Sequence, residues 1–76
     1  MVTMRREGKV KIEILADHNP PHFHVISPDS GFMVDLHSFA VIRGSGSGAE
    51  LTEAVEWAKA NAAVLLAKWR EINGLE

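Results

Sequence analysis

The chain has 76 residues, of which 46% are hydrophobic and 24% are charged, and its formal net charge is −2. This is the composition of one small globular domain, residues 1–76, with no general excess of charge that would favour nucleic acid. The absence of cysteine excludes disulfides and thiolate metal sites and is compatible with a cytoplasmic location.

The first predicted strand covers residues 9–15, because apolar and charged side chains alternate along it with a period of two. Its apolar face carries Val10, Ile12 and Ile14, and its solvent face carries Lys9, Lys11 and Glu13. Residues 1–8 are interpreted as a leader into this strand. The pattern indicates a half-buried strand with one wet face.

A stiff corner follows the first strand. Pro20 and Pro21 fix φ and lack a backbone N–H, and Asn19, which precedes a proline, is pushed out of helical space. The chain then enters an extended segment, residues 22–27. Because side chains alternate along a strand, one side should carry His22, His24 and Ile26, and the other Phe23 and Val25.

The next segments predict an antiparallel hairpin. Residues 28–31 have the composition of a tight turn, and residues 32–37 alternate again, so we expect them to pair with residues 22–27. Residues 39–43 can add a short fourth strand. Residues 44–48 are Gly-Ser-Gly-Ser-Gly, which we interpret as a flexible linker without the features of a phosphate-binding loop.

The rest of the chain predicts helix over about residues 49–73, beginning with a capping box of Ser47 and Glu50. One apolar stripe contains Leu51, Val55, Ala58, Ala62, Leu65, Trp69 and Ile72. An unbroken helix would be about 37 Å long, whereas the strands span roughly 20–25 Å. Both an unbroken helix and one kinked or broken near residues 60–61 are therefore considered. The expected fold class is α+β, with a sheet of three or four antiparallel strands covered by this helical segment.

Three of the four histidines lie close together in the corner and the segment after it. The candidate functional cluster is Asp17, His18, His22 and His24. Two imidazoles on one strand face can bind a divalent metal such as zinc, with Asp35 or His37 as a further ligand, or act as a general acid–base pair. The alternative is a polar strand face whose histidines are hydrogen-bonded to backbone and Asp17.

The run from Asp17 to Val25, Asp-His-Asn-Pro-Pro-His-Phe-His-Val, closely resembles the signature of a family of small bacterial proteins, domain of unknown function 4160. The resemblance extends over nearly the whole chain and implies no reaction. Its characteristic residues here are Asp17, His18, Pro20, Pro21, His22, Phe23 and His24, with the prolines and Phe23 as structural members. Family members are commonly encoded beside another small protein, which resembles the arrangement of toxin–antitoxin pairs and implies a protein partner.

Two functions follow as expectations. The first is a protein-interaction module that works through a partner protein or as a homo-oligomer, because a domain of this size has little core of its own. The alternative is a histidine-based phosphodiesterase, metal-assisted or metal-free, acting on RNA. Its support is the clustered imidazoles and a small basic group, Arg5, Arg6, Lys9 and Lys11. No apolar run approaches the roughly 20 residues of a membrane span, so no membrane association is expected.

Overall fold

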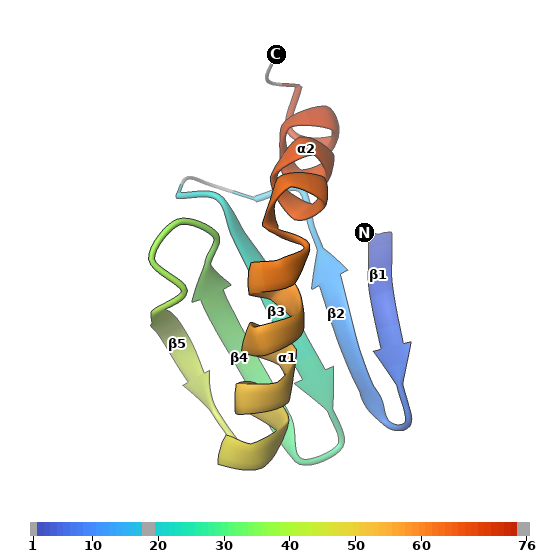
Figure 1. The fold of residues 1–76 in the computed structure, drawn as a ribbon, viewed down its shortest axis with the longest axis vertical. Helices are drawn as coiled ribbons and strands as arrows, with labels where there is room; N and C mark the ends of the chain where they lie inside the picture. The colour runs from blue at the N-terminus through green and yellow to red at the C-terminus, as the bar shows by residue number, and fades with distance from the viewer. Residues whose placement is uncertain (1, 18–19, 75–76) are drawn as a thin grey trace.

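The computed structural model describes residues 2–17 and 20–74, which form five strands followed by two helices (Figure 1). The strands are β1 (Val2–Glu7), β2 (Val10–Ile14), β3 (His22–Ser27), β4 (Ser30–Asp35) and β5 (Val41–Ser45). They form one antiparallel sheet in the order of the chain, β1-β2-β3-β4-β5. Helix α1 (Gly48–Ala60) crosses one face of the sheet, and α2 (Ala62–Ile72) lies beyond it towards one end. The predicted α+β class is confirmed.

The predicted count of three or four strands is wrong, because residues 2–7, interpreted from the sequence as a leader, form strand β1. A bulge interrupts its alternation, since the pairing with β2 shifts between Thr3 and Arg5. Gly8, with a φ of 59°, occupies the first position of the two-residue turn into β2, where a glycine is favoured. Because a bulge and a run of charged residues break the alternation of apolar and polar side chains, a period of two does not predict this strand.

The predicted hairpin of residues 22–27 and 32–37 is confirmed by β3 and β4, although β4 begins earlier, at Ser30. The possible fourth strand exists as β5 but extends into the predicted linker, residues 44–48, of which only Gly46 and Ser47 connect β5 to α1. The glycines there are needed for close approach of the backbone. Gly44 has a φ of 116°, and a side chain on it would collide with the main chain of β4.

The helical segment is broken at Asn61, so the broken form is the correct one of the two alternatives. The Asn61 side chain donates from Nδ2 to the carbonyl oxygen of Trp57 at 2.9 Å and thereby caps the end of α1. At the other end, the Ser47 hydroxyl accepts a hydrogen bond from the Glu50 N–H, as the capping box requires. The Glu50 carboxylate accepts hydrogen bonds from two serine hydroxyls at the β3–β4 turn, Ser27 and Ser30. This tethers α1 to the sheet.

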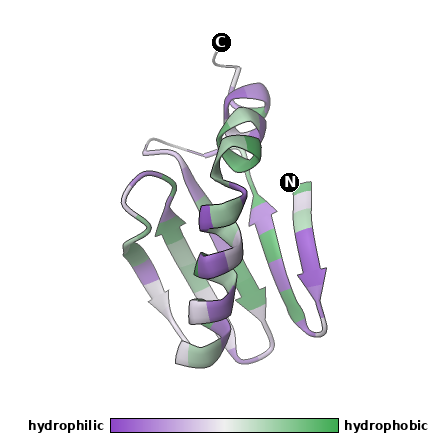
Figure 2. Ribbon diagram, in the orientation of Figure 1, coloured by the Kyte–Doolittle hydropathy of each residue, from purple (hydrophilic) through white to green (hydrophobic). Residues whose placement is uncertain are grey.

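The core lies between the helices and one face of the sheet. Hydrophobic residues alternate with hydrophilic ones along parts of the strands that carry it (Figure 2). The buried members of the core are Ile12, Ile14, Phe23, Val25, Phe32, Val34, Leu36, Ala54, Ala58, Leu65 and Trp69. Trp69 is 1% exposed, as its place on the apolar stripe predicts. Trp57 is partly buried against this core, and the guanidinium of Arg5 lies 5.5 Å from the centre of its ring.

The opposite side of the sheet, here called the open face, carries no helix of the described chain (Figure 1). The strand register places Lys11 beside Ile26, Glu13 beside His24, and His24 beside Met33 on this face. Arg43 of β5 is paired with Met33 and completes the row. None of the helices in the described part of the chain is long and apolar enough to cross a membrane.

Candidate functional site

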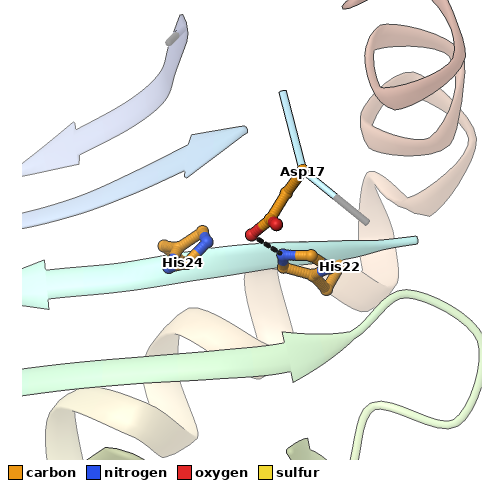
Figure 3. Close-up of side chains that lie close together, drawn as sticks. All are labelled: Asp17, His22 and His24. Atoms are coloured by element: carbon orange, nitrogen blue, oxygen red, sulfur yellow. Dashed lines mark hydrogen bonds and ion pairs between the residues drawn. The ribbon is translucent and has the colours of Figure 1, made fainter. Parts of the chain in front are cut away.

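Three polar side chains meet on the open face at the start of β3 (Figure 3). They are Asp17, which precedes the proline corner, and His22 and His24, which project from the same face of the strand. One potential ligand atom from each residue lies within 4.8 Å of those of the other two. The rings of His22 and His24 approach edge to face, with centroids 5.2 Å apart. We call these three residues the His–His–Asp cluster.

His22 is held in a fixed orientation at 3% exposure. Its Nδ1 lies 2.7 Å from the carbonyl oxygen of Pro20, and since a carbonyl can only accept, Nδ1 carries the hydrogen. Its other ring nitrogen, Nε2, lies 3.2 Å from Asp17 Oδ2. A neutral His22 would therefore direct a lone pair at a carboxylate oxygen. The contact therefore needs a proton between the two atoms, carried by Nε2 or by the carboxyl of Asp17, or a metal ion in its place.

His24 is the second imidazole of the cluster, and its Nε2 atom is buried with no hydrogen-bond partner in the described chain. Burial is the main effect that lowers the pKa of His24 below its ordinary value, and the charge of His22 lowers it further. The negative charges of Asp17 and Glu13 act in the opposite direction but are the smaller effects. His24 therefore favours the neutral imidazole, which is the form that binds metals.

Helix α2 frames the cluster from one end of the sheet. The Asp17 N–H donates to Asn73 Oδ1 at 3.0 Å, and the ring of Trp69 lies 4.9 Å from that of His22. Asn73 also caps α2, because its Nδ2 donates to the Trp69 carbonyl oxygen at 3.0 Å. The position of Asp17 thus depends on where α2 ends.

Glu13 belongs to the surroundings of the site, although its sequence pattern placed it on a wet strand face. It pairs directly with His24 across β2 and β3 and is 2% exposed. Its carboxylate lies 3.5 Å from Lys11 Nζ and 3.4 Å from the Thr3 hydroxyl. The alternation of Lys9, Lys11 and Glu13 shows the face but gives no sign of this burial, which depends on strand β1 and on the strand register.

The other predicted site residues have different places. Asp35 pairs with His22 across the hairpin, but its Oδ1 accepts hydrogen bonds from the His37 and Ser38 N–H groups at 2.6 and 2.9 Å. These two bonds lower the pKa of Asp35 and fix the loop into β5. His37 is exposed in that loop, and neither residue joins the cluster among the described residues. His18 lies outside the described residues.

The signature residues of the corner have structural contacts. The Pro20 carbonyl orients His22, and the Pro21 carbonyl accepts the Leu36 N–H at 2.9 Å. Phe23 is fully buried in the core. The run from Asp17 to Val25 therefore contributes Phe23 and Val25 to the core, and the residues around them orient the site.

Two histidines and one carboxylate form a set of ligands suited to zinc and other divalent transition metals, with coordination positions left for water or substrate. Bonds of about 2.0–2.2 Å to zinc suit the spacing of His22 Nε2 and Asp17 Oδ2, which are 3.2 Å apart, whereas the longer separations in the cluster, up to 4.8 Å, would have to shorten. The Asp17 side chain, 35% exposed, has freedom to do this. The bond from His22 Nδ1–H to a backbone carbonyl is the outer contact by which metal-binding histidines are usually oriented.

The fold and the site together define a small α+β domain with a His–His–Asp cluster on an open sheet face. The family model for the domain of unknown function DUF4160 matches residues 5–70, and the chain belongs to this family. No curated protein and no solved structure is significantly similar to the chain.

Proposed function

We propose that this domain binds a divalent transition metal, with zinc as the first candidate, through Asp17, His22 and His24. The observation that supports the proposal best is the contact between His22 Nε2 and Asp17 Oδ2, because two acceptor atoms at this distance need either a shared proton or a metal ion between them. The unpartnered Nε2 of His24 supports it independently. Because a proton and the metal compete for the same position, metal affinity should rise with pH.

A metal held by three side chains would act as a Lewis acid and lower the pKa of a bound water, which is the chemistry of metal-assisted hydrolysis. If the metal site is catalytic, the corresponding activity is the metal-assisted RNA phosphodiesterase considered from the sequence. The basic residues counted in its favour are divided between the two faces of the sheet. Arg5 pairs with Glu7 and lies over Trp57 on the helix side, while Lys11 lies opposite Arg6 and pairs with Glu13 on the open face. The two ion pairs leave less free positive charge for an RNA surface.

Calorimetric titration with Zn²⁺, combined with urea unfolding, tests the proposal. Wild-type protein should bind one equivalent and gain about 2.7 kcal/mol of stability at free zinc 100 times the dissociation constant. Asp17→Asn and His24→Gln should lose most of this gain, whereas His37→Gln, in the exposed loop, should keep it. Zinc binding that is equal in all four proteins would refute the site.

We also propose a second function, the protein-interaction module, because β5 is an exposed edge strand. All five residues of β5 are exposed, and the β-branched Val41 and Ile42 are 43% and 44% exposed. An unprotected edge of this kind can accept an extended segment of another protein as an additional strand. A toxin–antitoxin-like partner and a cytoplasmic location remain parts of this proposal.

Size-exclusion chromatography after co-expression with the product of the adjacent gene tests this second function. Ile42→Lys should abolish a complex that forms through β5. Val64→Lys places the same charge on an exposed apolar residue of α2, 58% exposed, and should leave the complex intact. A complex insensitive to Ile42→Lys would exclude β5 as the interface.

A further inference from the structure

A groove on the open face lies directly beside the His–His–Asp cluster. Its volume is about 310 Å³, and it spans β3, β4 and β5. It is lined by His24, Ile26, Gly31, Phe32, Met33, Arg43 and Gly44. Because His24 belongs to both the cluster and the groove, a molecule in the groove would lie next to a metal bound at the cluster.

Glycines are the reason that the sheet is hollow here. Gly31 lies on the open face between Ile26 of β3 and Ser45 of β5, and no atom lies within 4 Å of the place that its Cβ would take. A side chain at that position would project into open space. A glycine inside a strand, which weakens the strand, often marks a site where another molecule approaches the backbone closely.

The lining of the groove combines an apolar part with one strong cation. Ile26 and Met33 supply apolar side chains from the open face. The Arg43 side chain forms no ion pair or hydrogen bond with any residue that the structure describes, in contrast to the side chains of Arg5 and Lys11, which are both paired. A guanidinium without an acidic neighbour can offer two parallel N–H donors to an oxyanion.

We propose that this groove binds a phosphate ester of an apolar or aromatic alcohol, with the phosphate on Arg43 and the apolar group between Ile26 and Met33. The volume is at the lower end of those of small-molecule sites, which fits one such group. Under the proposed metal-binding function, this ligand class is the substrate class of the His–His–Asp cluster. The binding itself requires no metal and is tested without one.

The probe is phenyl phosphate, titrated into zinc-free protein and followed by the backbone amide signals in NMR. We expect saturable shifts at Gly31, Met33 and Gly44. Inorganic phosphate and phenol, which each carry only one half of the probe, should bind more weakly. Benzoate replaces the phosphate by a carboxylate, and equally tight binding of benzoate would overturn the choice of phosphate.

Two variants and one control locate the site. Arg43→Gln should weaken binding by about tenfold or more, because it removes both charge-assisted N–H donors. Gly31→Ile should fill the groove and abolish binding without strain, because space for the side chain is free. Arg70→Gln removes an exposed charge of α2 and should change nothing. Unchanged binding in both groove variants, or no saturable binding in wild type, would refute the groove.

The two proposals can fail separately. Zinc binding without phenyl phosphate binding would leave the metal site and remove its substrate class. Phenyl phosphate binding that persists when zinc fails to bind would establish the groove as a ligand site and refute the metal centre beside it. Shifts centred on Asp17 and His22 in place of Gly31 would place the anion on the cluster and overturn the assignment to Arg43.

Discussion

The two faces of strand β3 place neighbouring residues of one short sequence in opposite environments. Phe23 and Val25 are fully buried under the helices and hold the domain together. His22 and His24, on the open face, are withdrawn from solvent to different degrees and meet a carboxylate from before the corner. The difference shows that β3 supplies stability from one side and chemistry from the other, in strict alternation.

The open face is the less ordinary of the two, because it contains polar groups that are almost fully buried. Glu13 is 2% exposed and His22 is 3% exposed. Burial of charged or titratable groups disfavours folding unless they are paired. On the open face, Glu13 is accordingly paired with Lys11 and His22 with Asp17.

The largest expected effect comes from the covered face. Phe23→Ala should cost about 3–5 kcal/mol, a large share of the roughly 4–11 kcal/mol expected for a chain of this length. Met33→Ala, on the open face, should cost less than about 1 kcal/mol, as for partly exposed positions. Urea unfolding followed by circular dichroism measures both. A Met33→Ala cost that equals that of Phe23→Ala would mean that another molecule covers the open face in solution.

Much of the covered face can be predicted from the sequence, because alternation and helical periodicity depend only on which residues are apolar. Val10, Ile12 and Ile14 define β2, and the stripe ending at Trp69 and Ile72 defines the helical cover. The break at Asn61 was one of two alternatives, since no local pattern decides between a long helix and two short ones. Strand β1 was missed because its bulge destroys the period.

The site could be predicted only in part. The sequence brings His22 and His24 to one face, because they are two residues apart in an extended segment. It cannot decide whether Asp17 or Asp35 is the nearby carboxylate, since that depends on how the corner turns and on the loop that occupies Asp35 with the His37 and Ser38 N–H groups. The burial of Glu13 and the contact of Trp69 with His22 depend on register and helix docking, which alternation does not encode.

An intermediate effect is expected where the covered side meets the site, at the end of α2. Asn61→Ala and Asn73→Ala each remove a side-chain hydrogen bond to a helix carbonyl, at a cost of about 1 kcal/mol. Asn73→Ala alone also removes the acceptor of the Asp17 N–H and should lower zinc affinity by about tenfold, as loss of an outer contact does. Urea unfolding measures the loss of stability, and calorimetric zinc titration measures the loss of zinc affinity. Equal zinc affinity in both variants would show that α2 does not position Asp17.

The smallest expected effect is a pH dependence of the metal-free protein that arises on the open face. Burial lowers the pKa of His24 from its ordinary value of 6.5, with His22 acting in the same direction and Asp17 and Glu13 opposing it. The unfolded chain therefore binds a proton at His24 more readily than the folded chain does. Stability from this group is present above pH 6.5 and is lost as pH falls from there towards the lowered folded pKa.

The contribution of His24 to the pH dependence of stability is measured by urea unfolding between pH 8 and pH 5, a range that includes 6.5. The three proteins compared, all zinc-free, are wild type, His24→Gln and His37→Gln. The wild type and His37→Gln should lose stability in parallel on acidification, because the exposed loop histidine is remote from the buried one. His24→Gln should lose less, since glutamine cannot be protonated in the unfolded chain. If all three curves are parallel, His24 is as easily protonated in the folded chain as in the unfolded one. Its unpartnered nitrogen is then hydrated, and the open face differs from the covered face only in being polar.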